Sequence, residues 1–189
     1  MKRSQFLQTC AAGVCGCGLM ALLPPAPARA EEKKDQPAAP SAECEAQKRQ
    51  LDGARERFAI LVTIADEQLD AATRQKMLLR MGRECAKPYV AYFEKYRGDL
   101  KGFLAEAKAA WLESAEFDEK AGVLRTAGKP APCACPLAKA GRTPASFCDC
   151  SLGWNQAAFS TVIGKPVDVQ IEESVLRGGT RCRFRITIA

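Results

Sequence analysis

Apolar residues recur at three- and four-residue steps through the first half of the chain, a spacing that predicts a series of amphipathic helices. The first helix is expected from Glu43 to about Gln68. Its inward positions are expected to be Leu51, Ala54, Phe58, Leu61, Val62 and Ala65. Asp70 is a suitable N-cap for a second helix. The inward face of that helix is expected to carry Met77, Leu78, Met81 and Cys85, with Pro88 beyond its end.

Two shorter helices are predicted next. One carries Tyr89 to Tyr96 and ends at Gly98, because glycine interrupts a helical run. Asp99 can then cap a helix that continues to about Ser114. The apolar positions of this helix are Leu100, Phe103, Leu104, Ala107 and Trp111.

The pattern changes after Glu119. A strand is expected over residues 121–127 and a helix from about Leu152 to Ile163, ended by Gly164. Residues 167–176 and 181–188 alternate between apolar and polar, with a Gly-Gly turn between them, which predicts a terminal hairpin. Its second strand is expected to place Cys182, Phe184, Ile186 and Ile188 on one face. The predicted fold class is α+β, with an N-terminal helical half followed by a helix packed on a small antiparallel sheet.

The first thirty residues are typical of an export signal. Two basic residues precede an apolar stretch from about Ala11 to Leu23, and Ala28-Arg29-Ala30 suits cleavage before Glu31. The apolar run is shorter than the ~20 residues of a spanning helix, so no permanent membrane span is expected. The protein is therefore predicted to be periplasmic or secreted. The start MKRSQFL resembles a twin-arginine leader, although Ser4 occupies the second arginine position, and an ordinary secretory signal is the alternative.

The domain plan follows from these patterns. Residues 31–41 are charged and rich in Pro and Ala, which predicts a disordered linker. Residues 42–118 form the helical segment and residues 119–189 the Cys-rich α+β segment, and the two are expected to make one domain. The formal net charge is +6, but after residue 30 the chain has 25 basic and 22 acidic residues. No basic run is interleaved with aromatic residues, so nucleic-acid binding is not expected.

Cysteine is the residue type that points to chemistry. Four of the ten cysteines form two C-x-C pairs, at residues 133/135 and 148/150. In an extended segment, residues two apart point to one side, so the four thiols would converge if the two segments paired as neighbouring strands. Four thiolates can hold Zn, an iron-sulfur cluster or a soft ion such as Cu(I). The expected metal ligands are Cys133, Cys135, Cys148 and Cys150, with Cys85 as a substitute or fifth sulfur.

Two other interpretations of the cysteines stay open. Seven cysteines remain after the signal, so an oxidising compartment allows at most three disulfides, two of which would join the C-x-C pairs. Alternatively, the protein is an enzyme with Cys150 or Cys85 as the nucleophile. Cys150 precedes the predicted helix, whose N-terminal dipole favours a thiolate. Because the chain has no histidine, the base would be a carboxylate or a second thiol. The carboxylates considered for that role are Asp149, Glu172 and Glu173.

The remaining candidates are Cys182, interpreted as a small buried core residue, and two aromatic residues. Trp154 and Tyr89 are candidates to line a pocket for a small molecule between the helix and the sheet, with packing in the core as the alternative for each. The partners expected are therefore a metal ion or a small molecule.

Several motifs resemble those of a set of Cys-rich bacterial proteins grouped with the aminothiazoline-carboxylate hydrolase family and, more distantly, with 4-vinyl-reductase-type small-molecule-binding domains. They are GRECA (residues 82–86), CACPL (133–137), CDCSLGW (148–154), GKPV (164–167), ESVLRG (173–178) and CRFRI (182–186). The resemblance implies an α+β domain with a helix across an antiparallel sheet. We predict that the chain is an exported protein whose thiolate site binds a metal or cycles between thiol and disulfide. The alternatives are a hydrolase- or reductase-like enzyme and a disulfide-stapled ligand-binding module.

Overall fold

The structure is a computed structural model that describes residues 41–130, 133 and 135–189. The chain divides into two units, Met1–Leu51 and Asp52–Ala189. In the first unit, the described residues are the beginning of helix α2 (Ala42–Gln68). The predicted export signal and most of the predicted linker lie outside the described residues. Among the residues that are described, no helix has both the length and the apolar character needed to cross a membrane.

The second unit continues with helices α3 (Ala71–Ala86), α4 (Val90–Glu94) and α5 (Leu100–Ala110). Two of the predicted caps are confirmed. The Asp70 carboxylate accepts hydrogen bonds from the N–H groups of Ala72 and Thr73, both at 3.0 Å. The Asp99 carboxylate accepts one from Gly102 N–H at 2.8 Å. These side chains satisfy N–H groups that have no partner within the helix, which fixes where α3 and α5 begin.

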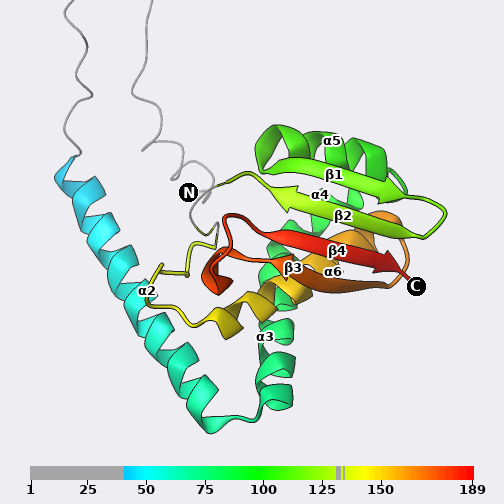
Figure 1. Ribbon diagram of the computed structural model, residues 1–189. Helices are drawn as coiled ribbons and strands as arrows, with labels where there is room; N and C mark the ends of the chain where they lie inside the picture. The colour runs from blue at the N-terminus through cyan, green and yellow to red at the C-terminus, as the bar shows by residue number, and fades with distance from the viewer. Residues whose placement is uncertain (1–40, 131–132, 134) are drawn as a thin grey trace, which may run out of the picture. The chain divides into compact units, whose positions relative to one another are not determined.

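The strands form one antiparallel sheet in the order β1-β2-β4-β3 (Figure 1). They span Leu112–Asp118 (β1), Val123–Gly128 (β2), Val167–Glu173 (β3) and Arg183–Ile188 (β4). The terminal hairpin is confirmed, since β3 and β4 pair along their length. Strand β1 was not predicted, because the helical pattern was extended to Ser114, whereas α5 ends at Ala110. The predicted α+β class is confirmed.

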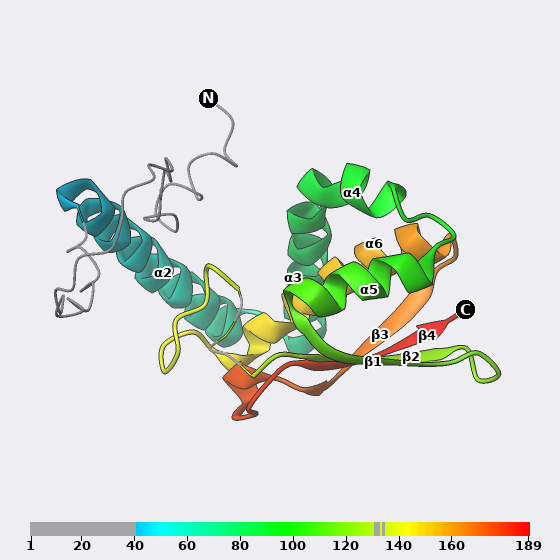
Figure 2. The same cartoon turned by 90° about the horizontal axis from the view of Figure 1, so that it is seen from above.

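The helices cover one face of this sheet. Helix α6 (Asp149–Ile163) packs on β3, and α5 contacts β1 (Figure 2). The register places Leu124, Ile186 and Val169 side by side on the covered face, where all three are buried. The opposite face carries a row of polar and charged residues, among them Arg125 beside Arg185. This separation of apolar and polar residues puts the main core between the sheet and α6.

Helices α3 and α6 cross in direct main-chain contact. A Cβ atom placed on Gly82 of α3 would overlap the carbonyl oxygen of Cys150 and lie 2.8 Å from the Trp154 nitrogen. A Cβ on Gly153 of α6 would overlap the carbonyl oxygen of Leu79. Only glycine fits at these two positions, because there is no flexible side chain that could move aside. Each glycine is three residues from a cysteine, Cys85 on α3 and Cys150 on α6.

The inward faces of α2 and α3 differ in part from the prediction. On α3 the buried residues are Leu78, Gly82 and Ala86, whereas Met77 and Cys85 are exposed. On α2 the buried residues are Ala59 and Val62. The reason on α3 is the glycine contact, which turns Gly82 and Ala86 toward α6 and leaves Met77 and Cys85 at the edge.

Candidate functional site

The two C-x-C pairs lie outside the sheet. Cys133 and Cys135 belong to the long loop after β2. Cys148 is the last residue of a short 3-10 helix (Ala145–Cys148), and Cys150 lies in the first turn of α6. The pairs therefore do not form neighbouring strands. They still come together, because Cys133, Cys135 and Cys150 all pack against one small apolar cluster, formed by Val62, Leu78, Ala138 and Phe147.

Two further cysteines reach the same place. Cys85 is exposed on α3, one helical turn beyond the glycine that touches the backbone of Cys150. Cys182 precedes β4 and is half-buried, and its carbonyl accepts a hydrogen bond from Gly128 N–H at 2.9 Å. Its thiol lies close enough to raise the pKa of Cys148, and it is only partly buried, unlike the small buried core residue that the sequence suggested. We call the six residues Cys85, Cys133, Cys135, Cys148, Cys150 and Cys182 the cysteine cluster.

Burial and mutual repulsion govern the electrostatics of the cysteine cluster. Burial raises the pKa of Cys133, Cys135, Cys148 and Cys150. The shift is largest at Cys150, where the neighbouring thiols, Cys135 and Cys85 first among them, raise the pKa further. At Cys148 the thiol that contributes most is Cys182, and the Ser174 hydroxyl acts in the opposite direction. At neutral pH these four thiols are therefore protonated and are poor nucleophiles.

The helix N-terminus does not give Cys150 the low pKa expected of a nucleophile, because burial raises the pKa of this thiol and outweighs the helix dipole. Helix α6 begins at Asp149 instead of near Leu152, so Cys150 lies in its first turn, where the dipole alone would favour a thiolate. Within residues 41–130, 133 and 135–189, the cysteine cluster consists of free thiols, and no three Cys, Asp or Glu side chains are grouped as ligands of a metal ion.

The carboxylates that were considered as bases are engaged in ion pairs. Arg177 donates a hydrogen bond to Asp149 at 2.7 Å, and Arg125 lies 3.5 Å from Glu172. Glu173 accepts hydrogen bonds from the Thr180 N–H at 2.7 Å and from Arg183 at 2.8 Å, and its pKa is lowered by these and neighbouring donors. The contacts of Asp149 and Glu173 organise the turn between β3 and β4. The same turn borders an open hollow of about 470 Å³ whose lining includes the buried Ser174.

The two aromatic candidates lie together at the edge of the main core. The Tyr89 ring lies 6.4 Å from the Trp154 ring, and Trp154 makes an edge-to-face contact with Phe93 at 5.4 Å. Trp154 is half-buried, whereas Tyr89 is 54% exposed. Packing therefore accounts for the position of Trp154, and Tyr89 is the ring that solvent reaches.

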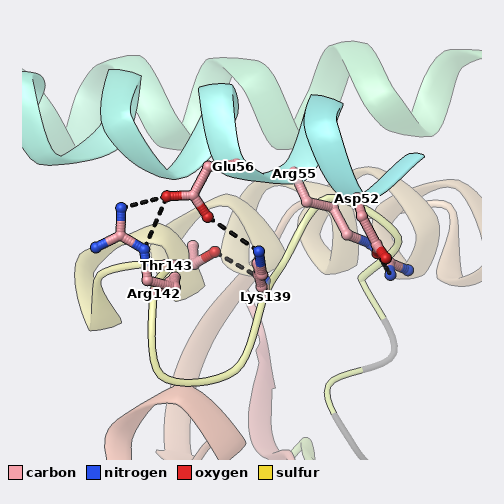
Figure 3. Close-up of polar contacts among 6 residues, drawn as sticks. All are labelled: Asp52, Arg55, Glu56, Lys139, Arg142 and Thr143. Carbon is pink, nitrogen blue, oxygen red and sulfur yellow. Dashed lines mark hydrogen bonds and ion pairs between the residues drawn. The ribbon is translucent and has the colours of Figure 1, made fainter. Parts of the chain in front are cut away.

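Helix α2 holds the loop that joins the two C-x-C pairs (Figure 3). The Glu56 carboxylate accepts hydrogen bonds from Lys139 at 3.0 Å and from Arg142 Nε at 2.9 Å, and Arg142 Nη2 also contacts it. Arg55 donates to the carbonyl of Pro136 at 2.7 Å. We call these contacts of Arg55 and Glu56 with the loop the clamp. The clamp was not predicted, because its partners lie about eighty positions apart and the sequence does not show which charged residues pair over that distance.

The clamp predicts a loss of stability in acid. Hydrogen bonds from Arg142 and then Lys139 lower the pKa of Glu56 from 4.5 to about 2. A carboxylate with a lowered folded-state pKa stabilises the fold above about pH 4.5, and this contribution is lost as the pH falls toward 2. We expect Glu56→Gln to lower the urea midpoint of unfolding at pH 6. The drop in midpoint from pH 6 to pH 3 should be smaller for this variant than for the wild type.

Glu119→Gln is the matched control for this measurement, because Glu119 is exposed at the β1–β2 turn, away from the clamp. It should leave both midpoints close to those of the wild type. An equal effect of the two substitutions would contradict a specific role for Glu56.

Comparison with known proteins finds similar solved structures but no similar sequence. The sequence matches no protein-family model and has no significant match among curated proteins. A crystal structure of trafficking protein particle complex subunit 3 from Naegleria fowleri, covalently bound to palmitic acid, is similar over 75% of this chain and 96% of that one, with 16% identity and a TM-score of 0.50. What the two chains share is the fold. The phenol-responsive sensory domain of the transcription activator PoxR, solved with phenol, aligns with 71% of this chain and 74% of that one at 14% identity and a TM-score of 0.46.

Proposed function

We propose that the cysteine cluster is a thiolate site of an exported protein, which binds a soft metal ion or cycles between thiol and disulfide. The observation that supports this function is that six thiols from separate parts of the chain come near one another: α3, the loop after β2, the 3-10 helix with the first turn of α6, and the segment before β4. Among the described residues no three of them are already grouped as metal ligands, so a bound ion would have to draw four of them together. Scarce, oxidisable residues gathered from separate segments are more than a folded core requires, since most buried positions here are filled by Ala, Val, Leu and Phe.

The raised pKa values define the chemistry of the metal-binding form. A buried thiol that stays protonated in the empty site loses its proton when a cation takes the proton's place, so binding releases protons and strengthens as the pH rises. Zn and iron-sulfur clusters take four thiolates, and Cu(I) also prefers sulfur. Cys133, Cys135, Cys148 and Cys150 are the proposed ligands, with Cys85 and Cys182 beside them.

The redox form uses the same thiols in pairs. Two thiols would form one S–S bond and pass two protons and two electrons to a disulfide-bearing partner, whose own S–S bond is reduced to two thiols. The enzyme alternative has less support, because the pKa of Cys150 is raised and the nearby carboxylates Asp149 and Glu173 are held in ion pairs. These features favour a site that holds a ligand or electrons over one that attacks a substrate.

Metal analysis of the purified chain tests the proposal. The protein is handled without oxygen and its metal content is measured by elemental analysis and native mass spectrometry. We expect metal in a fixed ratio to protein, and we expect it to be lost when Cys133 and Cys148 are both replaced by Ser. Cys44→Ser is the matched control, because it removes one thiol and keeps all six residues of the cysteine cluster.

The same samples separate the alternatives. Protein without metal whose cluster cysteines resist alkylation until a reductant is added would support the thiol/disulfide form. Six thiols that bind no metal and stay alkylatable after exposure to oxidised glutathione would contradict the proposal. An intact mass above that of the sequence by an organic group would instead favour the small-ligand-binding module, in line with the palmitic acid carried by the trafficking protein particle complex subunit.

A further inference from the structure

Helix α2 is apolar on two opposite sides. Phe58, Ala59 and Val62 face the cysteine-bearing loop, where Phe58 contacts the ring of Phe147 at 4.9 Å. At 3.6 residues per turn, Ile60 and Ile64 stand on the other side of the helix. Their residue exposures are 47% and 48%, and that of the adjacent Leu61 is 60%. Three large aliphatic residues in one and a half turns form an outward patch that is more than scattered surface hydrophobicity.

The outward patch is flanked by two charges of opposite sign. Arg57 and Glu67 are exposed on the same side of α2, and no ion pair to either side chain occurs among the described residues. The arrangement is symmetric about Val62: Ile60 and Ile64 are two residues away on either side, and Arg57 and Glu67 are five residues away. A surface with this symmetry is complementary to itself when it is turned by half a revolution.

From this symmetry we infer that the outward face of α2 binds a second copy of the chain, with the two α2 helices antiparallel and the two-fold axis near Val62. In this register Ile60 of each copy packs against Ile64 of the other. Arg57 of each copy lies beside Glu67 of the other, so one pairing satisfies both the apolar patch and the charges. A parallel pairing would place Arg57 beside Arg57 and Glu67 beside Glu67, which like-charge repulsion disfavours.

The charges also argue against a lipid surface as the occupant. Helices that lie on membranes carry Lys and Arg on their polar face to attract anionic lipid. Here one of the two charges at the border of the patch is acidic, and an anionic surface would repel Glu67. The dimer is independent of the proposed thiolate function, because its residues face away from the cysteine cluster.

Sedimentation velocity and light scattering on the purified chain test the inference. We expect the wild-type chain to form dimers that dissociate on dilution. We expect the Ile64→Lys variant to be monomeric. Arg57→Glu and Glu67→Arg should each weaken dimerisation about tenfold, since each variant brings two like-charged pairs together. The combined substitution Arg57→Glu with Glu67→Arg should restore the wild-type affinity. Val90→Lys, at a 40% exposed apolar residue of α4, is the control and should leave the dimer unchanged.

Three results would overturn the inference. The wild-type chain could stay monomeric up to about 1 mM, the concentration at which a dimer with a dissociation constant of about 1 mM is half assembled. The dimer could survive Ile64→Lys, or the combined charge exchange could fail to restore it. Circular dichroism distinguishes each result from unfolding of the variant. A monomeric wild type would leave the outward patch to a different protein.

Discussion

Gly82→Ala is expected to lower the free energy of unfolding by at least about 3 kcal/mol. The added methyl group would overlap the carbonyl oxygen of Cys150 and approach the Trp154 nitrogen to 2.8 Å. Both atoms belong to the main chain of α6, so the two helices would have to separate, and the packing on both sides of the crossing would be lost. Urea unfolding followed by circular dichroism measures the change.

Gly53→Ala provides the matched control. Gly53 also lies inside a helix, α2, but nothing comes within 4 Å of a Cβ atom placed there. Alanine has the higher helix propensity, so this variant should be as stable as the wild type or more stable by up to about 1 kcal/mol. If the two alanine variants unfolded at the same urea concentration, the close crossing of α3 and α6 would be contradicted.

The second large effect is expected at Phe147. Its side chain is 2% exposed, contacts Phe58 and belongs to the apolar cluster on which Cys133, Cys135 and Cys150 pack. Phe147→Ala would leave a cavity there and should cost about 3–5 kcal/mol. Because this cavity opens beside the buried thiols, cysteine alkylation should also become faster under native conditions.

Phe117→Ala is the control for this loss. Phe117 is 38% exposed on the edge strand β1, and its removal should cost much less than that of Phe147 and leave the alkylation rate unchanged. Stability and alkylation rate are measured on the same samples, by urea unfolding and by mass spectrometry. A Phe147→Ala protein with native stability and unchanged alkylation would show that Phe147 does not cover the thiols.

The sequence predicted the elements that are set by local chemistry. Asp70 and Asp99 cap helices through hydrogen bonds that span three residues, and strict alternation from Arg181 to Ile188 is a strand pattern in itself. Strand β1 was not predicted, because its seven residues do not alternate regularly between apolar and polar and its formation depends on pairing with β2. On α2 the spacing showed apolar residues, but it could not tell that Val62 faces inward and Leu61 outward.

The candidate site was predicted only in part for a similar reason. The two C-x-C pairs are visible in the sequence, but they come together by packing on one apolar cluster and not as the neighbouring strands that were expected. Cys85 was expected as a substitute or fifth sulfur, whereas Cys182 joins the cysteine cluster through tertiary contacts that no local pattern encodes. One signal was available: Gly82 precedes Cys85 by three residues, and Gly153 follows Cys150 by three. An isolated glycine inside a helical pattern is a sign of a close packing contact, and each of these two lies one turn from a cysteine.

The glycine crossing has a consequence for how the protein can change over evolutionary time. Where two helices touch through their main chains, the separation of their axes is fixed by atoms that every residue type shares. Substitutions elsewhere in the core can then accumulate without altering the spacing between Cys85 and Cys150. Homologous chains should therefore diverge freely in their large core side chains while the two glycines stay invariant.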